Sequence, residues 1–276
     1  MKTNNLILIY DDYCPLCSWY SNLFVKTGLL SSKGRVPFSK ADNEILSMIN
    51  IDNARNQIPL IDRGNNKVYY GIDAILEVLN QKIPFIRSIG NISFVRWFLL
   101  KFYKFISYNR KVIVAKKCGN GSFDCAPDFN IQYRLMFMTT FLLFNTLMLW
   151  PIHKIVLSSF SFYHLDFTTL QLAHFAFVLT NISLAASFRS KKSLEYLGQV
   201  NMLALIAVLL LSPLIILNLI FPIAEWAMMF YLGMVTMFII KEYVRRMEYV
   251  FMVRSNKTIV ITNFACMLGF VAYLFH

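Results

Sequence analysis

The sequence predicts an α/β N-terminal domain followed by an all-α membrane domain of about five transmembrane helices. Of its 276 residues, 57% are hydrophobic, and the mean hydropathy of +0.52 is too apolar for an ordinary soluble protein. Charged residues occur throughout 1–130, whereas 131–276 contain only ten Lys or Arg and five Asp or Glu, grouped between long apolar runs. Near the N-terminus, a short apolar run leads directly into two closely spaced cysteines.

The N-terminal apolar run, LILIY at 6–10, is short and partly β-branched, which predicts a buried strand. Residues 11–13 are expected to form a turn, and Pro15 suits the first position of a helix. Apolar residues then recur at helical spacing. We therefore expect Cys14 at the N-terminus of a helix and Cys17 one turn inside it.

This placement of the cysteines favours redox chemistry. The dipole and free N–H groups of a helix N-terminus stabilise a thiolate and lower the pKa of the first cysteine. Such a thiolate attacks a substrate disulfide, and a second thiol one turn away resolves the mixed disulfide. Cys14 is thus the candidate nucleophile and Cys17 the candidate resolving thiol. Asp11 either shuttles a proton to the resolving thiol or caps the helix as a turn residue.

A second patterned segment lies at 56–79, NQIPLIDRGNNKVYYGIDAILEVL. It predicts a strand, a Gly-Asn-Asn turn, a second strand and a helix. Pro59 opens the first of these strands, a position where a trans proline is ordinarily found. Together with the N-terminal strand and helix, this segment completes a β-α-β-β-α pattern.

Over 6–130 the chain resembles the DCC family of predicted thiol-disulfide oxidoreductases. The family is named for an Asp-x-x-Cys-x-x-Cys pattern, which Asp11, Cys14 and Cys17 match. The chain departs from it at Asp12, where the family usually has Gly, and at Tyr13, which replaces a second acid. Three further elements resemble the family, the last only loosely: Gly71-Ile72-Asp73-Ala74, Tyr108-Asn109-Arg110 and Cys125-Ala126-Pro127.

The resemblance implies a thioredoxin-like fold for the N-terminal domain, at 1–90. In thioredoxin-like folds, a cis-proline at the position of Pro59 faces the cysteine pair and binds the substrate backbone. A cis bond is unusual even before proline, so the ordinary trans bond is the alternative. The resemblance carries no implication for the membrane domain at 131–276.

Five apolar segments approach or reach the roughly 20 residues needed to cross a bilayer. They lie at 135–151, 167–188, 197–220, 222–240 and 258–275. The loops between them alternate between basic and nearly uncharged, as the positive-inside rule requires. The first apolar run is too short for a secretory signal peptide. We therefore expect a multi-pass protein of the cell inner membrane, with the N-terminal domain cytoplasmic and the C-terminus outside.

Polar residues interrupt the predicted spans. Interhelical hydrogen bonds are the expected role of the asparagines. For the ionisable His174, a functional role and a structural role both stay open, and a lone histidine does not make a haem site. The polar residues in the spans are Asn145, His174, Asn181, Asn201, Asn218 and Asn263.

Residues 91–130 combine a basic segment with a cysteine-containing loop, and no acidic residue occurs from Ser88 to Lys117. Either a helix here lies in the cytoplasmic interface of the bilayer, or its aromatic face packs on its own domain. The net charge of +12 then reflects basic cytoplasmic loops and attraction to anionic lipid, and not nucleic-acid binding. At helical spacing, one face collects Arg96, Lys101, Lys104, Ser107 and Lys111, and the opposite face collects Phe98, Leu99, Phe102, Phe105 and Ile106.

Other roles for the cysteines stay open. Cys118 and Cys125 could join Cys14 and Cys17 in a zinc site, although zinc ligands usually lie closer in sequence. They could also form a disulfide or relay electrons with the first pair. A quinone-linked disulfide system would need a cysteine pair near a membrane pocket, whereas the spans supply only Cys266, expected to be an inert apolar residue.

The sequence therefore predicts a membrane-anchored thiol-disulfide oxidoreductase that uses Cys14 and Cys17, assisted by Asp11 and Pro59, with no cofactor or metal. Expected partners are the lipid bilayer, a protein disulfide or thiol substrate, and other membrane subunits in a larger assembly. In a reducing cytoplasm, the net direction is reduction of the partner. The alternative is a non-catalytic thioredoxin-like interaction module in a subunit of a larger membrane complex.

Overall fold

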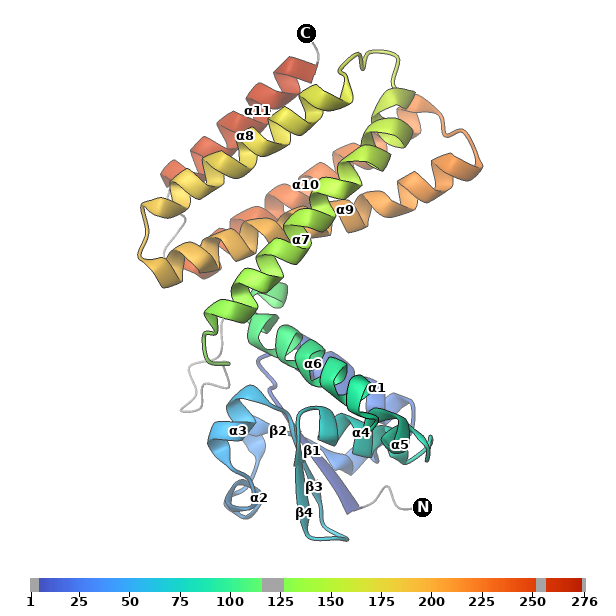
Figure 1. Cartoon of the computed structure of the whole chain (residues 1–276), viewed down its shortest axis with the longest axis vertical. Coiled ribbons are helices and arrows are strands. Elements are labelled where there is room, and N and C mark those ends of the chain that lie inside the picture. The colour runs from blue at the N-terminus through green and yellow to red at the C-terminus, as the bar shows by residue number, and fades with distance from the viewer. Residues whose placement is uncertain (1–4, 116–126, 252–256, 275–276) are drawn as a thin grey trace. The chain divides into compact units, whose positions relative to one another are not determined.

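The chain divides into two compact units, Met1–Tyr133 and Arg134–His276. The computed structural model describes residues 5–115, 127–251 and 257–274 (Figure 1). The first unit contains a small mixed sheet with helices, and the second unit is helical.

A four-stranded mixed sheet, in the order β2-β1-β3-β4, lies at the centre of the first unit. The strands are β1 (Leu6–Tyr10), β2 (Arg35–Pro37), β3 (Pro59–Asp62) and β4 (Lys67–Tyr70). β1 is parallel to β2, and the β1–β3 and β3–β4 pairs are antiparallel. A β-α-β unit followed by a β-hairpin and a helix is the order expected of a thioredoxin-like domain. The sequence does not predict β2, which has only three residues.

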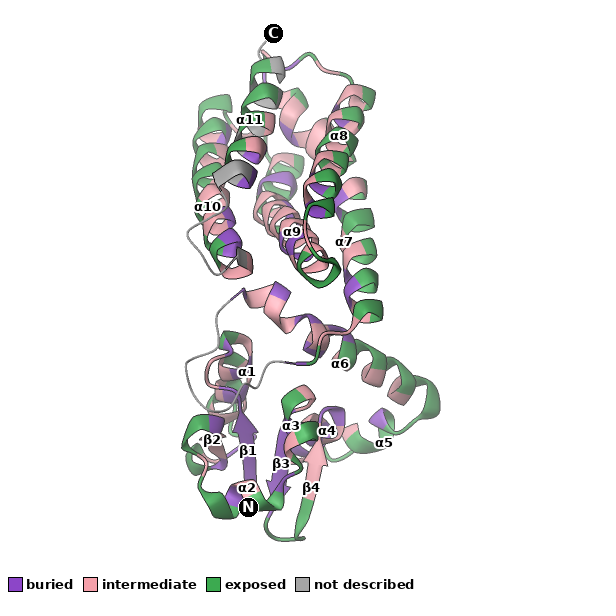
Figure 2. Ribbon diagram, turned by 90° about the vertical axis from the view of Figure 1, so that its left-hand side faces the viewer, coloured by how far each residue is buried: buried purple, intermediate pink, exposed green. Residues whose placement is uncertain are grey.

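Both faces of β1 are covered, and all five of its residues are buried (Figure 2). Its even-numbered residues pack with residues of α1 and α4, and its odd-numbered residues pack with residues of α2 and α3. This explains why the strand is apolar throughout and lacks polar alternation. The helices of this part of the chain are α1 (Pro15–Lys26), α2 (Asn43–Met48), α3 (Ile51–Asn56), α4 (Ile72–Asn80) and α5 (Ile86–Gly90), with short turns η2 (Ser32–Gly34) and η3 (Phe38–Lys40).

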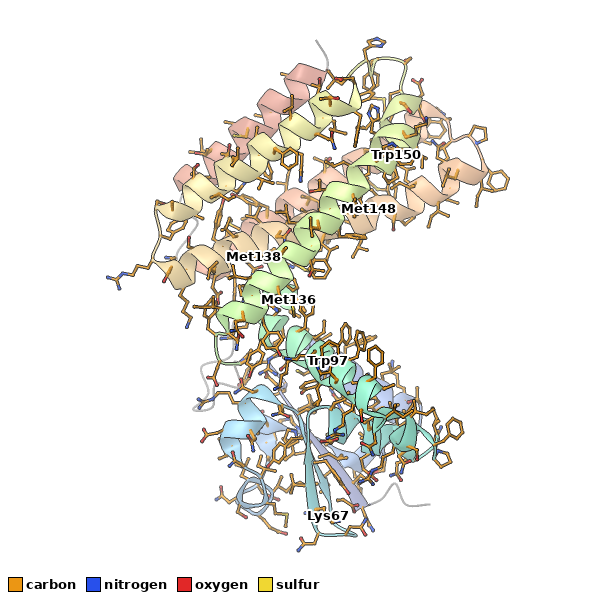
Figure 3. The ribbon with its side chains drawn as sticks, in the orientation of Figure 1. Lys67, Trp97, Met136, Met138, Met148 and Trp150 are labelled. Carbon is orange, nitrogen blue, oxygen red and sulfur yellow. The ribbon has the colours of Figure 1, made fainter. Side chains whose placement is uncertain are left out.

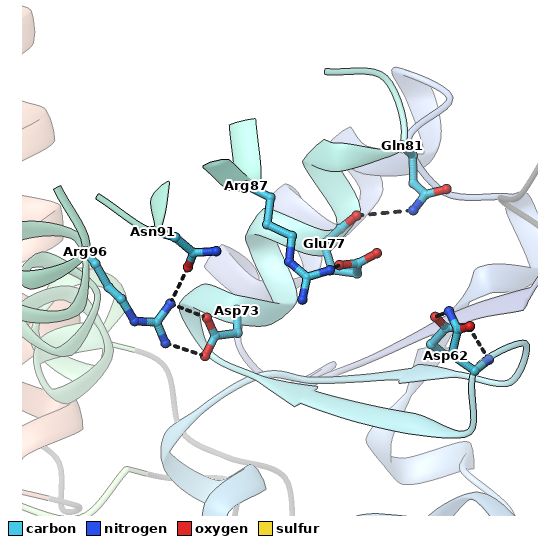
Figure 4. A network of polar contacts seen from close by, with 8 residues as sticks. Asp62, Asp73, Glu77, Gln81, Arg87, Asn91 and Arg96 are labelled. Carbon is cyan, nitrogen blue, oxygen red and sulfur yellow. Dashed lines mark hydrogen bonds and ion pairs between the residues drawn. The ribbon is translucent and has the colours of Figure 1, made fainter. Parts of the chain in front are cut away.

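The long helix α6 (Ser93–Val114) is attached to the domain through polar contacts. Near its start, the Arg96 guanidinium donates two hydrogen bonds to the Asp73 carboxylate, at 2.8 and 3.1 Å (Figure 4). Two turns later, the Tyr103 hydroxyl accepts the Ile58 N–H at 2.9 Å. The face of α6 that carries these side chains is therefore the face that contacts α4 and the start of β3.

Neither of the two faces expected of α6, one basic and one aromatic, lies wholly against the domain or wholly exposed. Arg96 and Ser107 contact the domain, since the Ser107 hydroxyl donates to the Asn56 carbonyl at 2.6 Å. Phe98 and Phe102, expected opposite to them, are exposed. The orientation follows from polar partners that the domain offers at fixed positions, which spacing along one helix does not reveal.

Four helices are long and apolar enough to cross a membrane in the described part of the chain. Their bounds by length and hydropathy are Ile131–Ser159, Phe167–Ala186, Ser190–Ile220 and Glu225–Val250. The corresponding elements are α7 (Ile131–Pro151) continued by η4 (Ile152–Val156) and η5 (Leu157–Ser159), α8 (Phe167–Ala186), α9 (Ser190–Ile220) and α10 (Glu225–Phe251).

The expected count of about five spans is therefore corrected to about four. The fifth predicted segment, 258–275, is helical as far as it is described, within α11 (Lys257–Leu274), but α11 is not among the four. Its 18 residues are near the lower limit for crossing a bilayer.

The asparagines of the apolar helices bond between elements, which confirms the structural role expected of them. The Asn145 amide in α7 donates to Asn201 Oδ1 in α9 at 3.3 Å. Asn181 Oδ1 in α8 accepts the Tyr196 hydroxyl of α9 at 2.5 Å. Because apolar surroundings offer no water, each such pair satisfies polar groups that would otherwise be unpaired. Further bonds of this kind are Asn201 to the Met138 carbonyl, Asn218 to the Ile155 carbonyl, and Asn263 to the Tyr196 and Tyr243 hydroxyls.

Candidate active site

The cysteine pair lies where strand β1 turns into helix α1. The Cys14 N–H donates to the Asp11 carbonyl at 3.2 Å, which closes the turn. Cys14 is the N-cap residue of α1, Pro15 occupies the first helical position, and Cys17 lies in the first turn. No side chain caps this helix. Free N–H groups of the first turn are therefore left to stabilise negative charge on Cys14.

The two thiols differ strongly in acidity. Both are free and buried. A hydrogen bond from the Cys17 side chain lowers the pKa of Cys14 to about 6, helped by the Cys17 backbone N–H and by Arg110 and opposed by burial. The same hydrogen bond, together with burial, raises the pKa of Cys17. The pair therefore holds its first thiolate on Cys14, and Cys17 keeps its proton.

Arg110 brings a positive charge to the buried dithiol from the far end of α6. Its Nη1 lies 3.9 Å from Cys17 Sγ, and its Nη2 donates to the Arg55 carbonyl at 3.0 Å. This charge lowers the pKa of both cysteines. In the sequence, Arg110 stands out only as part of the Tyr108-Asn109-Arg110 element. No role at the cysteines is evident there, because 93 positions separate Arg110 from Cys17.

Tyr20, one turn after Cys17 in α1, completes the polar surroundings of the resolving thiol. Its hydroxyl makes a hydrogen bond to Cys17, and burial raises the pKa of Tyr20 well above its usual value. A neutral phenol is therefore available to donate to sulfur. In the sequence, Tyr20 recurs with Trp19, Leu23 and Phe24 at helical spacing, a pattern that does not reveal a role for its hydroxyl.

Residues 8–116 match the family model described as DCC1-like thiol-disulfide oxidoreductase. The N-terminal part of the chain is a DCC1-like thiol-disulfide oxidoreductase domain. The match includes the cysteine pair on α1 and Arg110 on α6. A search of curated proteins found no match to the chain, and a search of solved structures found none. The helices from α7 onward lie outside the family match.

Asp11 belongs to the turn of the DCC1-like domain and does not cap α1. Its Oδ1 accepts the Tyr13 N–H at 3.0 Å, whereas the N-cap residue is Cys14. Burial raises the pKa of Asp11, and the charge of Arg110 opposes this shift. Of the two expected roles, capping is therefore wrong, and proton transfer stays a prediction.

Pro59 occupies the first position of β3, paired with Tyr70 of β4. No cis peptide bond occurs among the described residues, so the expected cis bond before Pro59 is wrong. The proline takes the trans form, which is the ordinary form at the start of a strand. Its predicted contact with a substrate backbone stays untested.

Of the remaining cysteines, the structure describes Cys266. Cys118 and Cys125, the partners in the zinc, disulfide and relay alternatives, lie outside the described residues. Within the described ranges, no three His, Cys, Asp or Glu side chains are grouped to hold a metal ion. Cys266 and His174 line an apolar cavity of about 550 Å³ among the helices of the second unit. His174 Nε2 lies 3.1 Å from Thr146 Oγ1, a contact that fits a structural role.

Proposed function

We propose that the DCC1-like domain catalyses thiol–disulfide exchange, with Cys14 as nucleophile and Cys17 as resolving thiol. The observation that carries this proposal is the difference in acidity between the two thiols at the start of α1. An exchange enzyme needs one sulfur ionised near neutral pH and a second, protonated sulfur within one helical turn. The family match at residues 8–116 supports the same chemistry.

The reaction proceeds in two exchanges. The Cys14 thiolate attacks one sulfur of a substrate disulfide, forms a mixed disulfide, and expels a substrate thiolate that takes up a proton. Cys17 then loses its proton and attacks Cys14 Sγ, which releases the second substrate sulfur as a thiol. The products are a substrate dithiol and a Cys14–Cys17 disulfide, so two electrons pass to the substrate. A thiol reductant restores the dithiol by the reverse exchanges.

The second exchange requires Cys17 to become a thiolate, which burial opposes. Arg110, 3.9 Å from Cys17 Sγ, stabilises that thiolate, and the Tyr20 hydroxyl donates to the same sulfur. We propose Asp11 as the proton acceptor, because its raised pKa brings a carboxylate closer to the range useful for proton transfer. Arg110 and Tyr20 are positioning residues in this scheme.

We propose that this activity lies at a membrane, because four helices of the described chain are long and apolar enough to cross one. Basic residues gather at the start of α9 and in the second half of α10, which four crossings would put on the same side as the DCC1-like domain. By the positive-inside rule, that side is the cytoplasm of a cell inner membrane. Cytoplasmic thiol reductants then favour reduction of a protein disulfide. A C-terminus on the outside would require α11 to cross as well.

A trapping experiment tests the activity in the full-length protein. We expect Cys17→Ser to accumulate mixed disulfides through Cys14, because the resolving thiol is missing. The Cys14→Ser and Cys17→Ser double variant should form none. Cys266→Ser, which leaves both redox cysteines in place, should behave like the unmodified chain.

Equilibration of the purified protein with glutathione buffers gives an independent measure, with the disulfide identified by peptide mass spectrometry. A reversible Cys14–Cys17 couple supports the exchange enzyme. Failure to form this disulfide at any glutathione ratio, with no trapped partner, would refute it and favour the non-catalytic interaction module.

A further inference from the structure

The first half of α6 carries a row of exposed aromatic side chains. Phe94 is 75% exposed, Trp97 59%, Phe98 54% and Phe102 52%. At 100° per residue, these four side chains and Lys101 fall within about 140° of the helix circumference. Phe94 stacks on Trp97, and Phe98 stacks on Phe102. We call these five residues the aromatic face of α6, and Figure 3 shows Trp97 on it.

The aromatic face cannot turn inward, because the opposite face of α6 is fixed to the domain. Arg96 binds Asp73, and Tyr103 binds the Ile58 backbone. Rotating the helix to bury the aromatic rings would break these contacts and leave the Ile58 N–H without its hydrogen-bond partner. The rings are thus held outward, and their large apolar area is available to another apolar medium.

Two features indicate what binds this surface: its positive charge and the short linker that joins α6 to α7. Lys101 lies within the aromatic face, Lys104 is exposed beside it, and no acidic residue occurs from Ser88 to Lys117. Residues 115–130 join α6 to α7, and such a linker spans at most about 55 Å. A bilayer crossed by α7 is therefore always within reach, at a high effective concentration.

We propose that the aromatic face of α6 binds the surface of an anionic phospholipid bilayer. Trp and Phe rings with interspersed lysines are the composition that favours the boundary between headgroups and acyl chains. The rings enter this boundary, while Lys101 and Lys104 contact phosphate groups. The proposal does not depend on redox chemistry at the cysteine pair.

Fluorescence quenching by brominated lipid tests the proposal on the full chain in nanodiscs. The other tryptophans, Trp19, Trp150 and Trp226, are each more than half exposed and can be replaced by Phe, so that Trp97 is the single probe. A matched control carries Trp97→Phe and Lys67→Trp, which moves the probe to an exposed position on β4 of the same domain (Figure 3).

We expect brominated lipid to reduce Trp97 emission by about twofold and to leave the control nearly unchanged. With anionic lipid present, the double variant Lys101→Glu and Lys104→Glu should show weaker quenching of Trp97. In zwitterionic discs, the double variant and the protein with both lysines should be quenched to the same extent. Equal quenching of Trp97 and the control probe would overturn the proposal. Blue-shifted Trp97 emission without quenching would also overturn it, because the face would then be covered by protein.

Discussion

Replacing Arg110 by Gln removes a positive charge 3.9 Å from the Cys17 sulfur and should make the dithiol a weaker acid. At 3.9 Å, two unit charges interact by about 1 kcal/mol in water and by about 4 kcal/mol at an effective dielectric constant of 20. One pKa unit corresponds to 1.36 kcal/mol. Because the 3.9 Å distance joins Arg110 to Cys17 and the first thiolate forms on Cys14, this energy is an upper bound, and the first ionisation should shift upward by less than about three units from a Cys14 pKa of about 6.

The sign follows from the charge. A cation stabilises a thiolate, so its removal raises the pKa, and the midpoint of Cys14 alkylation should move to higher pH. The assay is the pH dependence of iodoacetamide labelling in the full-length protein, followed on the peptide that contains Cys14. Arg110→Lys keeps the charge and should preserve most of the midpoint. Arg63→Gln makes the same chemical change at a surface residue and should have no effect.

An unchanged midpoint in the folded Arg110→Gln variant would refute the reasoning, since the guanidinium would then contribute nothing to thiolate stability. Arg110 also bonds the Arg55 carbonyl, so thermal unfolding must show that the variant is folded. If Arg110→Lys shifted the midpoint as far as Arg110→Gln, position and not charge would be the cause.

Two further predictions concern α1 and the start of α4. Cys17→Ala removes the hydrogen bond that is the largest cause of the low Cys14 pKa, so the alkylation midpoint should rise from about 6 toward that of an ordinary thiol, while Cys17→Ser should shift it less. A midpoint that stays near 6 in Cys17→Ala would contradict this cause. Gly71→Ala should destabilise the protein by about 1–3 kcal/mol, because φ at Gly71 is +59° and a Cβ would lie 2.7 Å from Gln57 Oε1. Thermal unfolding checks this, with Gly233→Ala as the control that should not destabilise the protein, because Gly233 lies inside α10 and a Cβ there would meet nothing within 4 Å.

Local features of the DCC1-like domain were predictable from the sequence because they depend on neighbouring residues. The apolar run of β1, the helix that begins after Cys14 and the hairpin of β3 and β4 all lie where the patterns predict. Strand β2 was missed, because three residues ending in Pro37 carry no periodicity. It pairs in parallel with the edge of β1 that β3 leaves open, a contact distant in sequence.

Features that depend on distant contacts were predicted poorly. Arg110 is brought to Cys17 by the packing of α6, which no local pattern encodes. The cis-proline was expected from fold resemblance alone and is wrong at Pro59. The count of spans was overestimated by one. The segment at 258–275 is apolar, but its helix α11 has 18 residues, which is near the lower limit for crossing a bilayer.

The contacts of α6 with the domain make this helix intolerant of changes in length. Four side chains on one side of α6 contact the domain: Arg96, Tyr103, Ser107 and Arg110. Inserting or deleting one residue between Ser107 and Arg110 would rotate everything beyond it by about 100° and shift it by about 1.5 Å along the axis. Arg110 would then point away from the dithiol although every atom of the cysteine turn stayed in place. The spacing within α6 is thus as much a part of the active site as the cysteine spacing itself.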